Sequence, residues 1–165
     1  MKISSRTEYG LRAMVALARM AGHERPVPLR AIAEAEAIPE PFLDQIMAKL
    51  RRANLVTSVR GVNGGYHLSR PAEQISVGEL VRVLEGSLAP IACVDDADPE
   101  SASCDLYAGC HARSVWVRVT KAIARALDQL SLADVMHDDV ARDAYSGPRF
   151  FLSVLFENRM SRCGI

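Results

Sequence analysis

Apolar residues recur at helical spacing through the first part of the chain. Between residues 5 and 21 they fall three and four positions apart, which puts them on one face of a helix, and Gly22 supplies a stop. The apolar positions of this segment are Leu11, Met14, Val15 and Ala18. The spacing recurs over residues 29–36 and 42–53, with Pro39 and Pro41 between them, and a proline is tolerated in the first turn of a helix. Two helices joined by a tight break are typical of a helix-turn-helix motif.

The next segment has the two-residue period of a β-hairpin. Residues 55–60 alternate apolar with polar side chains, and residues 61–65 contain Asn-Gly and Gly-Gly steps, which accept positive φ. Residues 66–68 start a returning strand, which Pro71 ends. A hairpin directly after a helix-turn-helix is the wing of a winged helix. Its glycine-rich tip, beside Arg60, suits a close approach to a phosphate backbone or a minor groove.

The second half of the chain predicts two further helices with a loop between them. Ser76 and Glu79 form a capping box that opens a helix ending at Gly86, whereas residues 87–109 show no sustained period. Residues 110–132 return to helical spacing, with Val115, Val119, Ile123, Leu127 and Leu130 on one stripe. A helix of about 22 residues rises roughly 33 Å, which exceeds what a small winged-helix domain can cover. We therefore expect it to pack on a copy of itself in a two-fold dimer; an intramolecular core helix is the alternative.

These patterns predict a mostly α-helical fold with a small β-hairpin wing, a winged helix-turn-helix domain followed by a long dimerisation helix. The expected divisions are residues 1–86 for the DNA-binding domain, 87–110 for a cysteine-bearing loop and 111–137 for the dimerisation helix. Residues 138–165 form a tail, with Cys163, to which no role is assigned.

The net charge of the chain is zero, which by itself argues against a nucleic-acid partner. The charge is unevenly distributed, however: residues 1–70 carry 11 Lys and Arg against 6 Asp and Glu, and residues 71–165 carry 9 against 14, so the halves balance at +5 and −5. Between Gln45 and Ala72 there are basic residues and no acidic ones, namely Lys49, Arg51, Arg52, Arg60 and Arg70. Such a stripe is either a solvated helix face or a phosphate-binding surface, and its position on a winged helix favours the second.

Composition is that of an ordinary globular protein, with 49% hydrophobic and 24% charged residues. No stretch approaches the roughly 20 apolar residues that span a bilayer, and the N-terminus lacks the apolar core of a secretory signal. We therefore expect a cytoplasmic protein without a membrane partner. Four cysteines without an export signal argue against a disulfide framework.

Three of the cysteines share one loop that ends at a helix N-terminus. Ten residues separate Cys93 from Cys104, and five separate Cys104 from Cys110. Thiolates are favoured at a helix N-terminus and are good ligands for soft metals, although three are one short of a closed structural site. Spacing alone leaves metal or cluster binding and inert cysteines as equal alternatives. No catalytic constellation accompanies these cysteines, so a thiol enzyme is disfavoured and no enzymatic activity is expected.

Together, these segments resemble the winged-helix iron–sulfur transcriptional repressor family that includes the iron–sulfur-cluster regulator IscR and the nitric-oxide sensor NsrR. The resemblance covers most of residues 1–132. It lies in MKISSRTEYGLRAMVALA, IPEPFLDQIMAKLRRANLV, SVRGVNGGYHLSR and ISVGELVRVLEG, and in the Cys104–Cys110 step with Trp116 after it. It implies a homodimer that binds double-stranded promoter DNA and represses transcription. The dimer would carry an iron–sulfur cluster that senses cluster status, iron, nitric oxide or redox state.

The resemblance also implies a set of cluster ligands. Cys93, Cys104 and Cys110 match the family's cysteine ligands, and Glu8 matches a carboxylate ligand that sensors of the family contribute from the partner subunit. An exposed helix carboxylate is the alternative for Glu8. In the cluster-assembly regulator a histidine follows the last cysteine by three positions. Here Arg113 stands there and cannot ligate, so the fourth ligand and the cluster type, 2Fe–2S or 4Fe–4S, stay open.

For DNA, the resemblance places Phe42, Asp44 and Gln45 on the base-reading face of the recognition helix and Arg60 on the wing. Gln pairs with adenine and Asp accepts from cytosine in the major groove, although Asp44 also suits the N-terminal dipole of its helix. We assign phosphate contacts to basic residues at the end of that helix, namely Lys49, Arg51 and Arg52. The alternative to cluster sensing is a cluster-free winged-helix regulator controlled by a protein partner or a metabolite.

Overall fold

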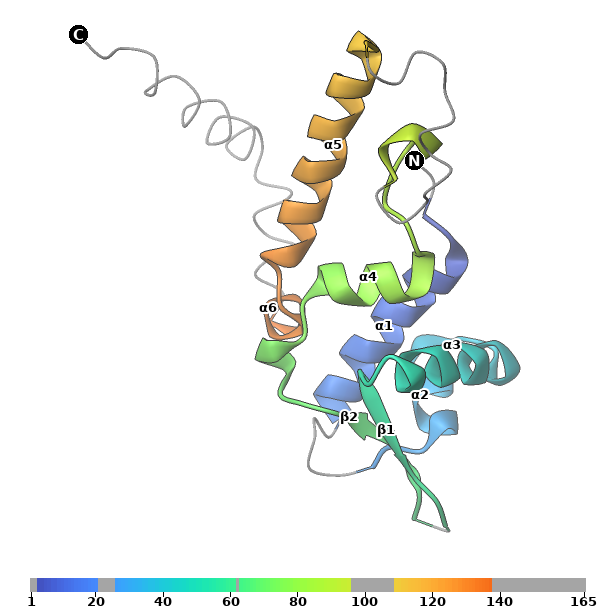
Figure 1. The fold of residues 1–165 in the computed structure, drawn as a ribbon. Coiled ribbons are helices and arrows are strands. Elements are labelled where there is room, and N and C mark those ends of the chain that lie inside the picture. Colours follow the sequence, from blue (N-terminus) through green and yellow to red (C-terminus); the bar gives the residue numbers. More distant parts are fainter. Residues whose placement is uncertain (1–2, 21–25, 62, 96–108, 138–165) are drawn as a thin grey trace, which may run out of the picture.

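The computed structural model describes residues 3–20, 26–61, 63–95 and 109–137 of the chain. Cys104, Cys163 and the tail from residue 138 lie outside the described residues. The elements in chain order are α1 (Ser5–Met20), α2 (Leu29–Glu36), α3 (Glu40–Arg52), β1 (Val56–Val59), β2 (Gly65–Leu68), η1 (Ala72–Gln74), α4 (Val77–Glu85), η2 (Ala92–Val94), α5 (His111–Asp128) and α6 (Leu132–Met136) (Figure 1). The three helices of the first half, the hairpin and the capped helix after it are confirmed.

The turn between α2 and α3 is closed by backbone geometry rather than by glycine. Ala37 adopts a left-handed conformation with φ of 50°, and the N–H of Ile38 donates to the Ala33 carbonyl at 2.9 Å. Pro39 then precedes α3, and Pro41 lies in its first turn, as expected from the missing N–H of proline. The two helices of the motif are thereby joined within a few residues.

The apolar faces of α1 to α4 enclose one core, which also takes in β1 and β2. Its largest side chains without exposed surface are Met14, Leu17, Ile32, Leu43, Ile46, Met47, Leu50, Leu55, Ile75, Leu80 and Leu132. Burial of each such side chain contributes roughly 1.5–3 kcal/mol. Gly10 allows α1 and α4 to cross closely, because a Cβ at that position would lie 2.2 Å from Leu84 Cδ1.

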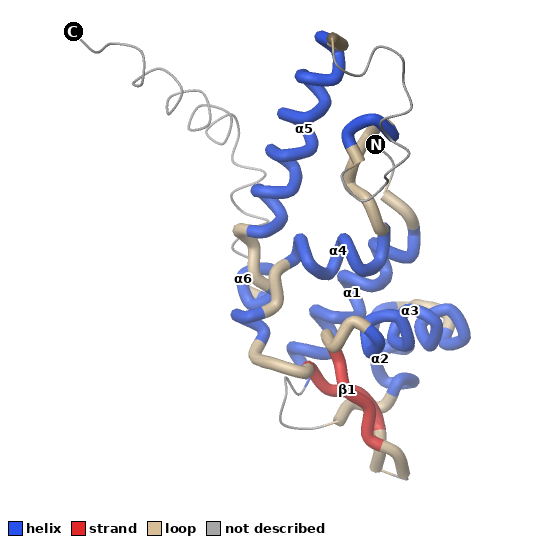
Figure 2. Tube along the Cα trace, viewed as in Figure 1, coloured by secondary structure: helices blue, strands red, loops and turns tan. Residues whose placement is uncertain are grey.

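The wing is an antiparallel hairpin in which Val56 pairs with Leu68 and Val59 with Gly65 (Figure 2). Its returning strand also pairs with Val27, two residues before α2. The Val27 N–H donates to the Tyr66 carbonyl at 2.7 Å, and the Tyr66 N–H donates to the Val27 carbonyl at 2.8 Å. The hairpin is therefore tied to the helix-turn-helix through its backbone.

The long helix expected over residues 110–132 is interrupted. The helix α5 ends at Asp128, and α6 starts at Leu132, where the Ser131 side chain and the Asp134 carboxylate form a capping box. The break lets Leu132 enter the main core with no exposed surface, and α6 packs on α1. Sequence spacing missed the break because the apolar stripe continues through Leu130.

The apolar stripe of α5 is covered at one end and open at the other. Ile123, Leu127 and Leu130 pack against a small cluster on and after α4, which consists of Val77, Val81 and Leu88. By contrast, Val115 is 56% and Trp116 38% exposed. Figure 1 shows this open end of α5 at the opposite end of the molecule from the wing. The intramolecular alternative thus holds for the second half of the stripe.

The capping box expected at the start of α4 is formed only in part. The Ser76 side chain accepts from the Glu79 N–H, as predicted, but the Glu79 carboxylate pairs with Arg70 instead of returning to the cap. Within the described ranges, no helix combines the length and apolar character needed to cross a membrane.

Gly65 provides a test of the bridge between the wing and α2. A Cβ there would lie 2.3 Å from the Val27 carbonyl oxygen and 2.8 Å from the Pro28 nitrogen, and backbone cannot yield as a side chain can. We expect Gly65→Ala to lower the free energy of unfolding by about 1–3 kcal/mol in chemical denaturation. Gly109→Ala is the control, since a Cβ there meets no atom of the described residues within 4 Å. Equal losses in both variants would contradict the close approach.

Candidate DNA interface and cysteine centre

The first turns of α3 present polar side chains to solvent. Asp44 and Gln45, both predicted to read bases, are exposed. Phe42, predicted with them, is half-buried and meets Tyr9 of α1 edge-on, with ring centroids 5.8 Å apart and planes at 86°. The structure thus leaves Asp44 and Gln45 free to reach outward and uses much of Phe42 for packing.

The basic residues at the end of α3 divide into two kinds. Arg51 and Arg52 are exposed; Arg51 Nη1 donates to the Ser58 hydroxyl of the wing at 3.2 Å, and Arg52 Nε donates to the Ala48 carbonyl of its own helix. Lys49 is half-buried, and its Nζ donates to the Leu84 carbonyl of α4 at 3.0 Å. Exposed guanidinium groups at a helix end suit phosphate contacts.

The wing places Arg60 in solvent beside the turn. Gly61 has a φ of 117°, and a Cβ on Gly64 would lie 2.3 Å from the Val59 carbonyl oxygen, so both positions favour glycine. On β2, burial raises the pKa of Tyr66, the charge of Asp44 on α3 raises it further, and Arg51 on α3 opposes this shift. The charges at both ends of the recognition helix therefore act on the wing strand.

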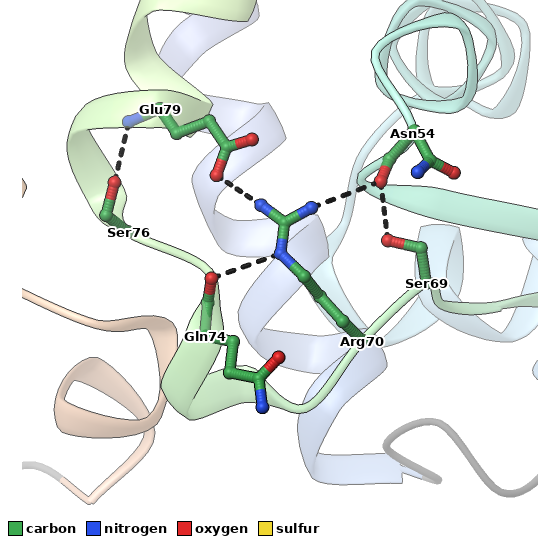
Figure 3. Close-up of polar contacts among 6 residues, drawn as sticks. All are labelled: Asn54, Ser69, Arg70, Gln74, Ser76 and Glu79. Carbon is green, nitrogen blue, oxygen red and sulfur yellow. Dashed lines mark hydrogen bonds and ion pairs between the residues drawn. The ribbon is translucent and has the colours of Figure 1, made fainter.

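Arg70 fastens the base of the wing, and sequence reasoning had assigned it no such role. Its guanidinium pairs with the Glu79 carboxylate of α4, while Nε donates to the Gln74 carbonyl at 3.1 Å and Nη1 to the Asn54 carbonyl at 3.4 Å (Figure 3). The Ser69 hydroxyl donates to the same Asn54 carbonyl. Because these partners lie on both sides of the hairpin, no local sequence signal identifies them.

The two described cysteines lie at the same end of α5. Cys93 belongs to η2 and Cys110 is the N-cap of α5; both are free and half-buried. Arg113, one turn into α5, donates from Nε to the Cys93 carbonyl at 3.0 Å and so links η2 to the helix. No group of three metal-type ligands occurs within the described ranges, which leave out Cys104. Cys93 and Cys110 stand before and after the segment that carries Cys104, and three thiols fit the donor chemistry of an iron–sulfur cluster.

Glu8 lies in the first turn of α1 with its side chain exposed. That turn is held to the end of α4, because the Glu85 carboxylate accepts from the Ser4 N–H at 3.2 Å and from the Ser4 hydroxyl at 2.6 Å, and also from the Thr7 hydroxyl. These hydrogen bonds lower the pKa of Glu85. Cys93 follows eight residues after Glu85 in the chain, so the turn that carries Glu8 is bonded to the helix end from which the cysteine segment continues.

Comparison with protein-family models matches residues 3–138 to Rrf2, described as an iron-dependent transcriptional regulator. The chain belongs to the Rrf2 family. Its match stops at the start of the tail, so residues 139–165 lie beyond the Rrf2 segment.

Relatives of this Rrf2 chain include the protein rrf2 of Nitratidesulfovibrio vulgaris, 38% identical over 84% of this chain and 89% of that protein. Among solved structures, CymR, the global cysteine regulator of Bacillus subtilis, has a TM-score of 0.66 at 35% identity, covering 83% of this chain and 97% of that one. IscR of T. potens has a TM-score of 0.66 at 39% identity, covering 92% and 96%. The Rrf2 chain is accordingly a winged-helix transcriptional regulator and not an enzyme.

Replacement of Arg70 tests the anchor of the Rrf2 wing. The Arg70 side chain is 28% exposed, so Arg70→Met is expected to lower the free energy of unfolding by about 1–2 kcal/mol through loss of charge-assisted hydrogen bonds. Arg30→Met is the matched control, because Arg30 is 78% exposed and pairs with Glu34 within one helix, so its replacement should change the free energy of unfolding clearly less than Arg70→Met does. Similar losses in the two variants, measured by urea denaturation, would show that the network adds nothing.

The lowered pKa of Glu85 predicts how the free energy of unfolding changes at acid pH. Since its pKa is lowered on folding, its contribution is present above the unfolded-state value, roughly 4.3, and is lost as pH falls through the lower folded-state value. Glu85→Gln should therefore be less stable than the wild type at neutral pH, with the difference disappearing in acid. Thermal unfolding across the acid range measures this, with Glu73→Gln, at an exposed position of η1, as the control. A difference that is constant with pH would contradict the assignment.

Proposed function

We propose that the chain is a homodimeric repressor whose affinity for promoter DNA depends on an iron–sulfur cluster held by Cys93, Cys104 and Cys110. The observation that carries this proposal is the placement of Cys93 and Cys110 together at one end of α5 in a member of an iron-dependent regulator family. A bound cluster, 2Fe–2S or 4Fe–4S, would supply a centre sensitive to iron, oxygen and nitric oxide. The protein would act in the cytoplasm.

The chain's own residues have distinct tasks in this proposal. Cys93, Cys104 and Cys110 hold the cluster, and Glu8 from the partner subunit is the candidate fourth ligand, since Arg113 stands where a histidine ligand would otherwise lie. The Arg113 guanidinium is instead occupied in part by the Cys93 carbonyl, which keeps η2 against α5. The open end of α5, with Val115 and Trp116 exposed, supports pairing with a second copy near the cysteines.

DNA binding follows the winged-helix geometry. Asp44 and Gln45, with the exposed part of Phe42, would face bases in the major groove. Arg52 and Arg60, and with them Arg51, would contact phosphates or the minor groove, because their guanidinium groups are exposed on the recognition helix and the wing. Two copies joined through α5 would set the spacing of the two half-sites.

The cluster assignment is tested by Cys104→Ala after anaerobic purification. Loss of one of three thiolate ligands should abolish visible absorbance and remove iron and sulfide, while circular dichroism stays as in the wild type. The matched control is Cys163→Ala, which removes a thiol outside the ligand set and should retain the full spectrum. Oxygen or nitric oxide should change DNA affinity in the wild type and in the control. A complete cluster spectrum in Cys104→Ala would falsify the assignment.

The similarity to CymR favours a second candidate, a cluster-free regulator of the same architecture that responds to a protein partner or a metabolite. Its supporting observation is the 35% identity over 97% of the CymR structure. Such a protein would bind DNA equally with and without iron, and would keep its DNA affinity in Cys104→Ala.

A further inference from the structure

The basic stripe predicts a phosphate contact for Lys49, but in the structure Lys49 contacts the end of α4. Its ammonium group donates to the Leu84 carbonyl at 3.0 Å, and its side chain is half-buried between α3 and α4. Leu84 is in the last turn of α4 (Val77–Glu85), where carbonyl groups have no partner within the helix. A cation at this position also interacts favourably with the negative end of the helix dipole. Lys49 thus satisfies the end of a neighbouring helix.

The end of α4 that Lys49 contacts is held in two further ways. The Leu84 side chain is 1% exposed and lies against Gly10 of α1. The next residue, Glu85, accepts hydrogen bonds from Ser4 and Thr7 at the start of α1. The Lys49 contact adds α3 to this junction, so three helices meet at one helix end.

The chain leaves this junction toward the cysteines. Gly86, with a φ of 93°, ends α4, and Leu88 packs beside Val77 and Val81. Cys93 follows in η2. A displacement of the segment that carries Cys93 therefore acts first on the helix end that Lys49 holds.

We propose that Lys49 is a positioning residue for DNA binding: it holds the last turn of the recognition helix on the end of α4, and through that contact the state of the cysteine segment reaches the recognition helix. The first part requires only that the protein binds DNA. The second part rests on the proposed cluster function. The proposal differs from a phosphate contact in a measurable way, because a phosphate contact releases counterions and a contact between helices does not.

The experiment compares the salt dependence of DNA affinity in Lys49→Met and Arg52→Met. The probe is a duplex that the wild-type protein selects from a random-sequence pool, and binding is measured by fluorescence anisotropy over a series of KCl concentrations. We expect Lys49→Met to lower affinity several-fold at every salt concentration with the slope of log K against log salt unchanged. Arg52→Met, an exposed cation three residues along the same helix, should reduce that slope by about 0.9.

A smaller slope in Lys49→Met, matching that of Arg52→Met, would assign Lys49 to a phosphate and overturn the proposal. Unchanged affinity in Lys49→Met would overturn it as well. Lys49→Arg keeps a donor for the Leu84 carbonyl and should restore the DNA affinity. If Lys49 served only stability, Lys49→Met would keep the wild-type affinity once it is shown to be folded. If Lys49→Met does not fold, Lys49→Gln takes its place under the same slope criterion.

The link to the cysteine segment is read from the same binding curves after iron chelation. In the wild type, chelation should change the affinity, and in Lys49→Met this change should be smaller. A full chelation response in Lys49→Met would overturn the link. An absent response in the wild type would instead refute the cluster function and, with it, this second part, while the slope result for Lys49 would stand.

Discussion

The close crossing of α1 and α4 is the constraint from which the positions of the other elements follow. Gly10 lets the α1 backbone approach the buried side chain of Leu84, so α1 and α4 cross closely. The start of α4 then receives Arg70 from the base of the wing through Glu79. Its far end receives Lys49 from α3 and binds the start of α1 through Glu85. Because α4 contacts the base of the wing at one end and the recognition helix α3 at the other, it sets the position of the wing relative to α3.

A second close approach joins the long helix to the same scaffold. A Cβ at Gly78 would lie 2.0 Å from the Asp128 carboxylate, so the absence of a side chain there lets the end of α5 reach α4. Asp128 then pairs with Arg82 of α4. This pair is partly exposed, so its own contribution is small, and the packing beneath it of Leu127 and Leu130 supplies more of the stability. Among the described residues, this close approach holds the end of α5 nearest α6, whereas the other end of α5 contacts η2 through Arg113.

Elements set by local spacing could be predicted from the sequence, and features set by distant partners could not. The apolar periods of residues 5–21 and 42–53 and the glycine-rich turn are local signals, and the structure has the helices and the hairpin there. The interruption of the long helix was missed because Leu127 and Leu130 continue its stripe, although Ser131 caps a new helix. Spacing also identified the apolar face of α5 without its partner, since the period is the same for a face that meets α4 and for one that meets solvent.

In the candidate DNA interface, the sequence likewise did not show which basic residues contact another helix and which are exposed. A count of the basic residues between Gln45 and Ala72 treats them as equivalent, yet Lys49 and Arg70 are engaged with α4, whereas Arg51, Arg52 and Arg60 are exposed. The surface that can meet phosphate is therefore smaller than the stripe, and it is concentrated at the end of α3 and the wing.

The cysteine spacing is informative in a different way from the charges. The spacing indicates thiolate ligands for a soft metal, whereas the hydrogen bond from Arg113 to the Cys93 carbonyl could not be predicted from it, because that bond depends on the fold. A guanidinium cannot serve as a metal ligand, because it has no acceptor. Any four-ligand set built on the three cysteines must therefore take its fourth member from elsewhere.

An exposed carboxylate such as that of Glu8 could come from a second copy only if the two chains meet near the cysteines. The open face of α5 with Val115 and Trp116 begins directly after Cys110. In the proposed cluster function, Arg113 stands where a histidine ligand would lie, so a ligand set completed by Glu8 of a second copy would require the two chains to pair near the cysteines.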